Sequence, residues 1–197
     1  MTSSETTDSP TDRAGKRERL VASAGDLMHR QGVPATTLAQ VAEAADVPVG
    51  NVYYYFKTKD DLIRAVIDDR VAGVRGMLAA LDQRRSPATR LKALARHWAD
   101  MRDVIASNGC PIGTLCAELG RREDGLEAES AVLFRLIVDW AEAQFRLLGR
   151  RDAHDHAVTL LAGVQGAAQL SHAFGDPDLM AAQARALERW IDAMTVG

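Results

Sequence analysis

The sequence predicts an all-α protein, and three observations lead to this prediction. Strong helix formers such as Ala, Leu, Arg and Glu are abundant, whereas β-branched residues are few. Apolar residues recur at intervals of three and four, the spacing of a helix with one buried face. No stretch shows the alternation typical of a strand. With 197 residues, 47% apolar and 26% charged, the chain can form one ordinary globular domain or two small ones.

The helices can be placed in order from residues that begin and end them. Nine helices are expected, over residues 13–31, 38–45, 48–56, 58–81, 86–108, 112–119, 127–148, 153–174 and 178–194. Most starts carry a capping or first-turn residue, in chain order Asp12, Thr36 or Thr37, Pro48, Thr58 with Asp61, Ser86 before Pro87, Asp152, and Asp176 before Pro177. Gly32 ends the first helix, and the segment 108–111 ends the fifth.

Two segments bear on where the protein resides. The first twelve residues are small, polar and acidic, which predicts a disordered tail without a signal peptide or an anchor. Ala157 to Gly175 contains no charged residue, but its glutamines and its histidine favour a buried protein helix over a membrane span. Two cysteines cannot form a disulfide framework and fit a reducing cytosol. A cytoplasmic protein without membrane contact is therefore expected.

The two short helices over 38–45 and 48–56 form a helix-turn-helix pattern supported by the longer helix before them. Helices of about two turns are unstable alone, so they must pack. At 100° per residue, Val49, Val52 and Phe56 lie within about 60° of one another and are expected to form the buried side.

The opposite side of the third helix carries Gly50, Asn51 and Tyr54, with Tyr53 and Tyr55 on its flanks. A core can bury only one stripe of such a helix, so three adjacent tyrosines indicate a partner surface. Tyrosine suits thymine methyl groups, sugars and phosphates, and Asn51 can both donate and accept at a base edge. Gly50 lets the backbone approach closely. The alternative is that Tyr53 and Tyr55 are half-buried packing residues.

The charge distribution favours DNA as that partner. Residues 13–59 contain seven Lys or Arg and four Asp or Glu, a balance of +3, whereas the residues before and after them each carry −3. Lys59 lies at a helix N-terminus, where backbone amides and the helix dipole favour a phosphate, and Lys57 is close to it. Alone, such a cluster would be an ordinary solvated surface. Beside the two short helices it indicates a DNA-binding segment.

From Thr37 to Leu62 the sequence reads TLAQVAEAADVPVGNVYYYFKTKDDL, which resembles the DNA-binding signature of TetR-family transcriptional regulators. The resemblance implies a nine-helix TetR-like fold, with a helix-turn-helix domain over 13–60 and a ligand-binding and dimerisation domain over 61–197. It also implies a homodimeric repressor that a small molecule releases from a near-palindromic DNA operator. The expected DNA-binding residues are Thr37, Val49, Gly50, Asn51, Tyr53, Tyr54, Tyr55, Lys57 and Lys59.

The sequence departs from the family pattern at two positions. Asp46 stands where the family usually has glycine in the turn, and aspartate tolerates left-handed geometry better than most residues. Pro48 stands where serine commonly caps the recognition helix, and its fixed φ suits the first turn. Neither departure removes the helix-turn-helix prediction.

The C-terminal region is expected to hold an apolar or aromatic effector, because residues 109–119 resemble a stretch found in one subgroup of TetR proteins, some of which respond to aromatic, drug-like compounds. Candidate ligand-binding residues are the large apolar side chains Trp98, Met101, Leu115, Phe134, Val138 and Trp140. The alternative is that these residues form plain core. No cofactor is expected.

Three further ligand candidates, Gln165, Gln169 and His172, form a polar stripe on the uncharged helix over 153–174. This stripe could face a ligand or form hydrogen bonds across a dimer interface. The resemblance places the dimer interface on this helix and the last one, over 178–194. Small residues that permit close helix approach are Ala162, Gly163 and Gly166.

The sequence offers little for an enzyme. Cys110 and Cys116 are not spaced like zinc ligands, and His154 and His156 diverge at a helix start. No phosphate-binding loop, nucleophile elbow or His-Glu-x-x-His motif occurs. The alternatives to a ligand-responsive repressor are a regulator of the same fold that activates transcription or senses redox state through Cys110, and a helical small-molecule enzyme.

Overall fold

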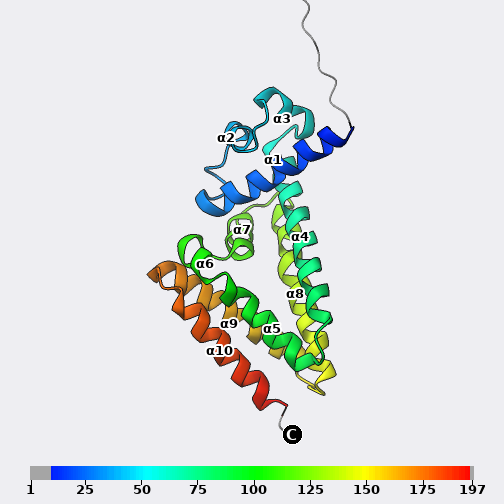
Figure 1. Ribbon diagram of the computed structural model, residues 1–197, viewed down its shortest axis with the longest axis vertical. Coiled ribbons are helices and arrows are strands. Elements are labelled where there is room, and N and C mark those ends of the chain that lie inside the picture. The colour runs from blue at the N-terminus through cyan, green and yellow to red at the C-terminus, as the bar shows by residue number, and fades with distance from the viewer. Residues whose placement is uncertain (1–9, 196–197) are drawn as a thin grey trace, which may run out of the picture. The chain divides into compact units, whose positions relative to one another are not determined.

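The computed structural model describes residues 10–195, which form helices and no strand (Figure 1). The helices are α1 (Pro10–Gln31), α2 (Leu38–Ala44), α3 (Val49–Tyr55), α4 (Lys59–Asp82), α5 (Pro87–Asp100), α6 (Arg102–Asn108), α7 (Pro111–Leu119), α8 (Leu126–Leu147), α9 (Ala153–Phe174) and α10 (Asp178–Ala193). The predicted all-α fold class is confirmed.

The helix predicted over 86–108 is divided at Met101, so this part of the chain holds one helix more than expected. Met101 has φ −96° and ψ 11°, which ends α5, and α6 begins at the next residue. The apolar stripe continues across the break, with Trp98 and Ile105 both buried. The apolar spacing therefore continues through Met101, and this spacing does not reveal that one helix ends there and another begins.

The first helix begins earlier than predicted. Residues 1–9 of the expected tail lie outside the described residues, but Pro10 already belongs to α1, whose start was expected at Arg13. Proline suits a first helical position, because its missing N–H is one that the helix would leave unpaired.

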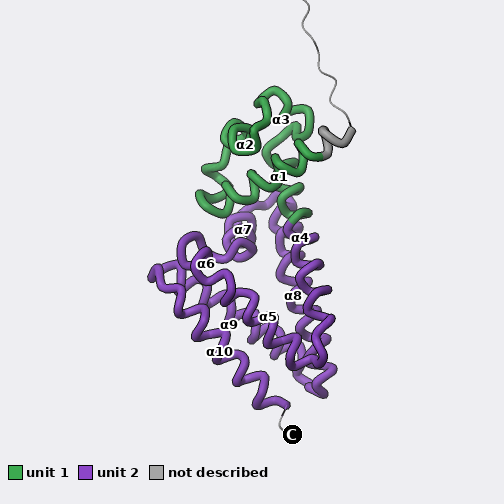
Figure 2. Tube along the Cα trace, in the orientation of Figure 1, with its two compact units in different colours: residues 1–69 green, residues 70–197 purple. Residues whose placement is uncertain are grey.

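The chain divides into two compact units, residues 1–69 and 70–197 (Figure 2). The division falls inside α4, whereas the sequence predicts the domain boundary at its start, between residues 60 and 61. The first turns of α4 carry buried Leu62, Ile63 and Val66. These turns therefore supply part of the apolar interior of the first unit.

The first unit is built around α1, α2 and α3. Leu20 and Ala24 of α1 are buried, as are Val41 of α2 and Val52 of α3. The sequence predicts that Val49 belongs to the buried side of α3, but Val49 is 46% exposed. The correction has a simple cause: Val49 is the first residue of α3, and that turn extends beyond the apolar interior.

The second unit is a bundle in which α9 packs against α8, α10 and α6, and α5 packs against α10 and α8. Its largest fully buried side chains include Trp98 of α5, Leu133 and Phe145 of α8, and Ile105 of α6. On α10 the buried side chains are Met180, Ala184, Leu187 and Ile191. No helix within residues 10–195 is long and apolar enough to cross a membrane.

Candidate nucleic-acid interface and candidate ligand cavity

The turn between α2 and α3 depends on Asp46. Its φ of 51° makes it the one non-glycine residue in the described part of the chain with a left-handed backbone. The Val47 N–H donates to the carbonyl of Ala42 at 3.0 Å, and the Asp46 N–H donates to that of Glu43 at 3.2 Å. These two bonds form the Schellman arrangement that ends a helix. Asp46 thus adopts the geometry expected of the glycine that it replaces.

A network of side chains shapes the entry to α2. Thr37 is the N-cap, and its hydroxyl accepts from the Gln40 N–H while the Gln40 side chain accepts from the Thr37 N–H, which completes a capping box. Thr36 is buried and donates to the carbonyl of Gly32 at 2.8 Å. Gln31 donates to the carbonyl of Ala35 at 3.2 Å. Side chains on both sides of the loop before α2 therefore hold it in place, and the role of Gln31 was not predicted from the sequence.

Two of the three tyrosines of α3 are exposed, and the third is half-buried. Tyr53 is 51% and Tyr54 62% exposed, whereas Tyr55 is half-buried and meets the Tyr54 ring edge to face at 5.1 Å. Val52 on the opposite side is fully buried. A Cβ added at Gly50 would meet no atom within 4 Å. Packing within this unit therefore does not require glycine at position 50.

Pro48 is the N-cap of α3, with φ −55° and ψ 133°, and not a residue of the first turn as expected. It offers no side-chain capping bond. Asn51, the polar residue predicted on the outer side of this helix, is half-buried and donates its N–H to the Pro48 carbonyl at 2.8 Å. Its side chain remains the candidate for contact with a base edge.

The two lysines after α3 make contacts with the backbone. Lys57 is exposed and donates to the carbonyl of Tyr53 at 3.0 Å. Lys59 donates to the carbonyls of Val33 and Pro34 in the loop before α2. The ammonium of Lys59 therefore stabilises that loop, a role that sequence reasoning missed because the partners lie more than twenty residues away.

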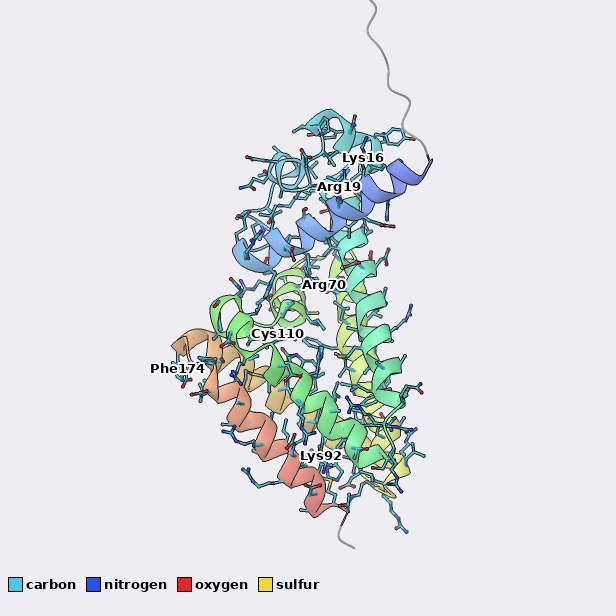
Figure 3. All side chains as sticks on the ribbon, in the orientation of Figure 1. Lys16, Arg19, Arg70, Lys92, Cys110 and Phe174 are labelled. Carbon is cyan, nitrogen blue, oxygen red and sulfur yellow. The ribbon has the colours of Figure 1, made fainter. Side chains whose placement is uncertain are left out.

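Arginines of α1 also have structural roles that the sequence did not predict. The guanidinium of Arg17 lies over the Phe56 ring at 5.4 Å, a cation–π contact. Arg19 donates to the carbonyl of Ala45 at the end of α2 at 3.2 Å. Figure 3 labels Lys16 and Arg19 along this helix. The basic excess of the segment thus contributes both to its charge and to the positions of α2 and α3.

In the second unit, a cavity of about 390 Å³ lies among α7, α8 and α9. This first cavity is lined by Gly109, Cys110, Gly113, Thr114, Ala117, Glu118, Phe134, Gln165, Ala168 and Gln169. A second cavity of about 220 Å³ is lined by Phe134, Val138, Val158, Leu161, Ala162 and Gln165. Phe134 and Gln165 line both, so the two cavities adjoin. The structure therefore brings Phe134, Val138, Gln165 and Gln169 together among the predicted ligand residues.

Gly113 allows α7 to approach α9 at the first cavity. A Cβ added there would lie 2.4 Å from Oε1 of Gln165 and 3.3 Å from the Cβ of Cys110. The same Gln165 side chain donates to the Cys110 sulfur at 3.5 Å. A larger residue at position 113 would require the end of the Gln165 side chain to move.

The other predicted ligand residues do not line either cavity. Trp98 and Leu115 are buried, and Met101 is half-buried at the α5–α6 break. The Trp140 indole donates to Asp82 at 3.0 Å. His172 is exposed, and its Nδ1 lies 3.2 Å from the carbonyl of Ala106, within hydrogen-bond distance.

Neither cysteine has the surroundings of a reactive thiol. Cys110 is buried, and Cys116 donates to the carbonyl of Ser130 at 3.3 Å. Burial raises the pKa of the Cys116 thiol to about 11, which keeps it protonated. Within residues 10–195, no three His, Cys, Asp or Glu side chains gather as metal ligands would.

Two residues of α9 make contacts within the chain that the sequence did not predict. Asp152 is the N-cap of α9 but forms no capping bond through its side chain; it lies 3.0 Å from Nε2 of His156 instead. Gly163, expected at a dimer interface, allows approach within the chain: a Cβ there would lie 2.7 Å from the side chain of Gln183 on α10.

The chain is similar to known transcriptional regulators. The family described as "Bacterial regulatory proteins, tetR family" matches residues 20–66, which include α2 and α3. The HTH-type transcriptional repressor KstR2 of Mycolicibacterium smegmatis is 30% identical over 88 residues, 44% of this chain and 43% of the relative. An uncharacterised HTH-type regulator of Mycobacterium tuberculosis is 28% identical and covers 80% of this chain and 84% of its own. The chain spans 40 to 62% of the length of the first three relatives matched.

Solved structures share the fold along nearly the whole chain. A TetR transcriptional regulator from Chloroflexus aurantiacus superposes with a TM-score of 0.81 at 21% identity, over 91% of this chain and 96% of its own. A TetR-family regulator from Streptomyces coelicolor gives 0.80 at 21% identity, over 92% and 97%. At this level of identity the likeness concerns the fold.

Proposed function

The chain belongs to the TetR family of transcriptional regulators, and from this premise we propose that it is a repressor that a small-molecule effector releases from its operator. It would bind a near-palindromic operator as a homodimer. The family relatives indicate a DNA-binding regulator and not an enzyme. Two of them, from Mycolicibacterium smegmatis and Rhodococcus jostii, are named repressors, which supports repression rather than activation of transcription. We place this activity in the cytoplasm, where bacterial operators lie.

The exposed aromatic face of α3 is the single observation that carries the proposal. Tyr53 and Tyr54 are large, exposed and adjacent, whereas Val52 is buried on the opposite side of the helix. A helix of this size fits the major groove, where an exposed ring can contact thymine methyl groups and Asn51 can pair with a base edge. The open space beside Gly50 supports a close approach of the helix backbone to DNA.

Phosphate contacts would fix the position of α3 in the groove. Thr37 caps the N-terminus of α2, and Lys59 is the first residue of α4. Helix N-termini offer backbone amides and a favourable dipole to a phosphate. Lys57 adds an exposed positive charge. Such contacts carry affinity and salt dependence but no sequence preference.

The uncharged face of α9 supports homodimerisation. Val158 is 45%, Leu170 49% and Phe174 71% exposed, and no residue from Ala157 to Gly175 is charged. Exposed apolar side chains on one helix indicate a surface that another protein covers. In a two-fold dimer each surface meets its own copy, so a face without charge avoids like-charge contacts.

The two adjoining cavities of the second unit support a small-molecule effector. Their lining combines the Phe134 ring and aliphatic side chains with a few polar groups, the usual character of ligand sites. Binding would shift the population toward a form of the dimer that no longer fits both half-sites. The lining favours an effector with an apolar or aromatic body.

Selection of bound duplexes from a random DNA library tests the proposal. The wild-type protein should enrich a near-palindrome, and a labelled duplex of that sequence should then bind in fluorescence anisotropy far more tightly than a scrambled one, with a steep salt slope. Tyr54→Ala should lose most of this preference. Leu147→Ala, which removes an exposed apolar side chain from α8, is the matched control and should bind as the wild type does.

The absence of any enriched sequence from the selection would contradict the proposal. Equal loss in Tyr54→Ala and Leu147→Ala would contradict the assignment of the DNA-reading face to α3. For the effector, Gln165→Ala should alter the concentration at which a releasing compound acts, while the dimer persists.

A further inference from the structure

Two turns at one end of the second unit carry the same sequence feature. Each contains two successive arginines directly before the N-cap residue of the next helix: Arg84 and Arg85 before α5, and Arg150 and Arg151 before α9. The two turns are far apart in the sequence but lie side by side (Figure 1). Positive charge therefore gathers at this end, although residues 60–197 together carry a net charge of −3.

Side-chain hydrogen bonds join the two turns. Arg90 of α5 donates to the carbonyl of Arg84 at 3.1 Å and to the side chain of Gln144 at 3.2 Å. The Trp140 indole donates to Asp82, the last residue of α4, at 3.0 Å. Gln144 and Trp140 both lie in the C-terminal part of α8, which leads into the second turn. Contacts among α4, α5 and α8 therefore hold the two arginine pairs near each other.

Three of the four arginines can meet a partner. Arg84, Arg85 and Arg151 are exposed, and none of them forms an ion pair within residues 10–195. Arg150 differs, because its Nε lies 3.6 Å from the Asp152 carboxylate. The positive charge of this end is thus carried mainly by the three exposed arginines.

The acidic side chains nearby offset only part of this charge. Glu142 is already bound by a basic side chain of its own helix and by His154. Asp82 accepts from an indole and not from a cation, and Asp155 is exposed in the first turn of α9. These two carboxylates face the charges of Arg90 and of the three exposed arginines, so a positive excess remains.

An exposed leucine lies beside the arginines. Leu147, the last residue of α8, is 65% exposed. It follows Gln144 by one helical turn, so the two lie on nearly the same side of α8, and it shortly precedes Arg151. We call Arg84, Arg85, Leu147 and Arg151 the arginine–leucine surface.

The chemistry of the arginine–leucine surface selects its occupant. Guanidinium groups bind carboxylates through paired hydrogen bonds, and exposed cations attract an acidic partner. Leu147 adds an apolar contact that a phosphate backbone would leave unused, and the surface has no aromatic ring on which a base could stack. The first twelve residues of this chain are acidic but contain no leucine, isoleucine, valine or aromatic side chain to cover Leu147.

We infer that the arginine–leucine surface binds an acidic segment of another protein, and that this segment also carries apolar side chains. Its carboxylates pair with the three exposed arginines, and an apolar side chain covers Leu147. The surface belongs to the second unit alone, so this contact depends neither on the operator nor on the effector of the proposed function.

The test uses a fluorescein-labelled peptide composed of glutamate, leucine and serine, whose anisotropy is measured as the protein is added. The wild type should bind this probe, and its affinity should fall as the salt concentration rises. A peptide with lysine in place of glutamate should not bind. A peptide with serine in place of every leucine should bind more weakly, since nothing then covers Leu147.

Variants locate the probe on the protein. Arg85→Glu combined with Arg151→Glu should weaken binding about tenfold, and Leu147→Ala about threefold. Arg135→Glu is the matched control: it makes the same charge change at an exposed position of α8, roughly 18 Å along the helix from Leu147, and should leave probe binding unchanged. All these positions are exposed, and circular dichroism checks that each variant is folded.

Lys57→Ala serves as a second control, because the basic DNA-reading unit could also attract an acidic peptide. It should bind the probe as the wild type does. Loss of probe binding in Lys57→Ala, with the double arginine variant unaffected, would place the peptide on the wrong unit and overturn the inference.

Three further outcomes would also overturn it: a wild type that does not bind the probe, equal loss in Arg135→Glu and in the double arginine variant, or a double variant that loses random duplex DNA but keeps the peptide. In each case the library selection can still enrich an operator, which would leave the proposed repressor intact. A selection without an enriched sequence would instead reject the proposed function, whatever the peptide does.

Discussion

The ammonium of Lys59 donates to the carbonyl oxygen of Pro34 at 3.2 Å and also to that of Val33. It therefore joins the first turn of α4 to the loop that leads into α2. A residue expected to contact phosphate thus also holds the DNA-reading unit together.

Lys59→Ala should consequently lower two quantities. The free energy of unfolding should fall by about 1 kcal/mol, since a charged donor to two carbonyls is removed. Affinity should fall on all DNA sequences, with a flatter dependence on salt. Chemical denaturation and anisotropy over a salt series measure the two effects. Lys57→Ala is the control: it should flatten the salt dependence with almost no change in stability, because Lys57 is exposed. An unchanged salt slope in both variants would mean that neither lysine contacts phosphate.

Asn51→Ala should change sequence preference more than total affinity. Loss of one base-edge contact costs about 1 to 3 kcal/mol at the contacted position and relaxes discrimination there. Binding to duplexes with single substitutions in each half-site measures this effect, with the Lys57→Ala protein as comparison. Uniform weakening on every duplex would contradict a base contact by Asn51.

Tyr54→Ala should lower the affinity for DNA without lowering the stability of the fold. Because the side chain is 62% exposed, stability should change by less than about 0.5 kcal/mol, while operator affinity falls. Val52→Ala, two positions away and fully buried, should instead cost about 2 kcal/mol of stability. Thermal unfolding and anisotropy on both variants provide the comparison. A large stability loss in Tyr54→Ala would show that the ring packs inside the unit.

Replacing Asp46 should test the left-handed turn. Asp46→Gly should raise the stability by about 0.5 kcal/mol, because glycine adopts φ near +51° without strain. Asp46→Val should lower it by about 1 to 2 kcal/mol, since a β-branched residue is strained there. Urea denaturation of the two variants measures the difference. Equal stability of the two would contradict the positive φ.

Cys116 should react slowly in the folded protein. Its pKa is raised to about 11 by burial, from an ordinary value near 9, so at pH 8 its thiolate fraction should be about 100-fold lower than in the unfolded chain. The raised folded pKa also contributes stability that is complete below pH 9 and is lost as the pH rises toward 11. Alkylation rates in native and denaturing buffer, with Cys116→Ala as control for the pH dependence, measure both effects. Native alkylation as fast as in denaturant would contradict this environment.

Much of the DNA-reading unit follows from local sequence. A threonine cap for α2 (at Thr36 or Thr37), the Thr58 start of α4 and the left-handed Asp46 were predicted, because each depends on groups within about four residues, and the structure places the cap at Thr37. Exposure of Tyr54 followed from helical periodicity. Val49 was misplaced because periodicity assigns a direction to a side chain but does not show how far the apolar interior extends.

The sequence by itself determined most of the helices, their order and the resemblance of the helix-turn-helix segment to TetR regulators, because these depend on residue spacing and on short-range hydrogen bonds. Only the tertiary structure decided which side chains meet across long distances in the chain. Lys59 with Pro34 and Gln165 with Cys110 are such pairs, and the break at Met101 lies within an apolar stripe that continues on both sides of it. The physical reason is that periodicity fixes which face of a helix is apolar, whereas the neighbour that covers this face is chosen by the packing of all helices together.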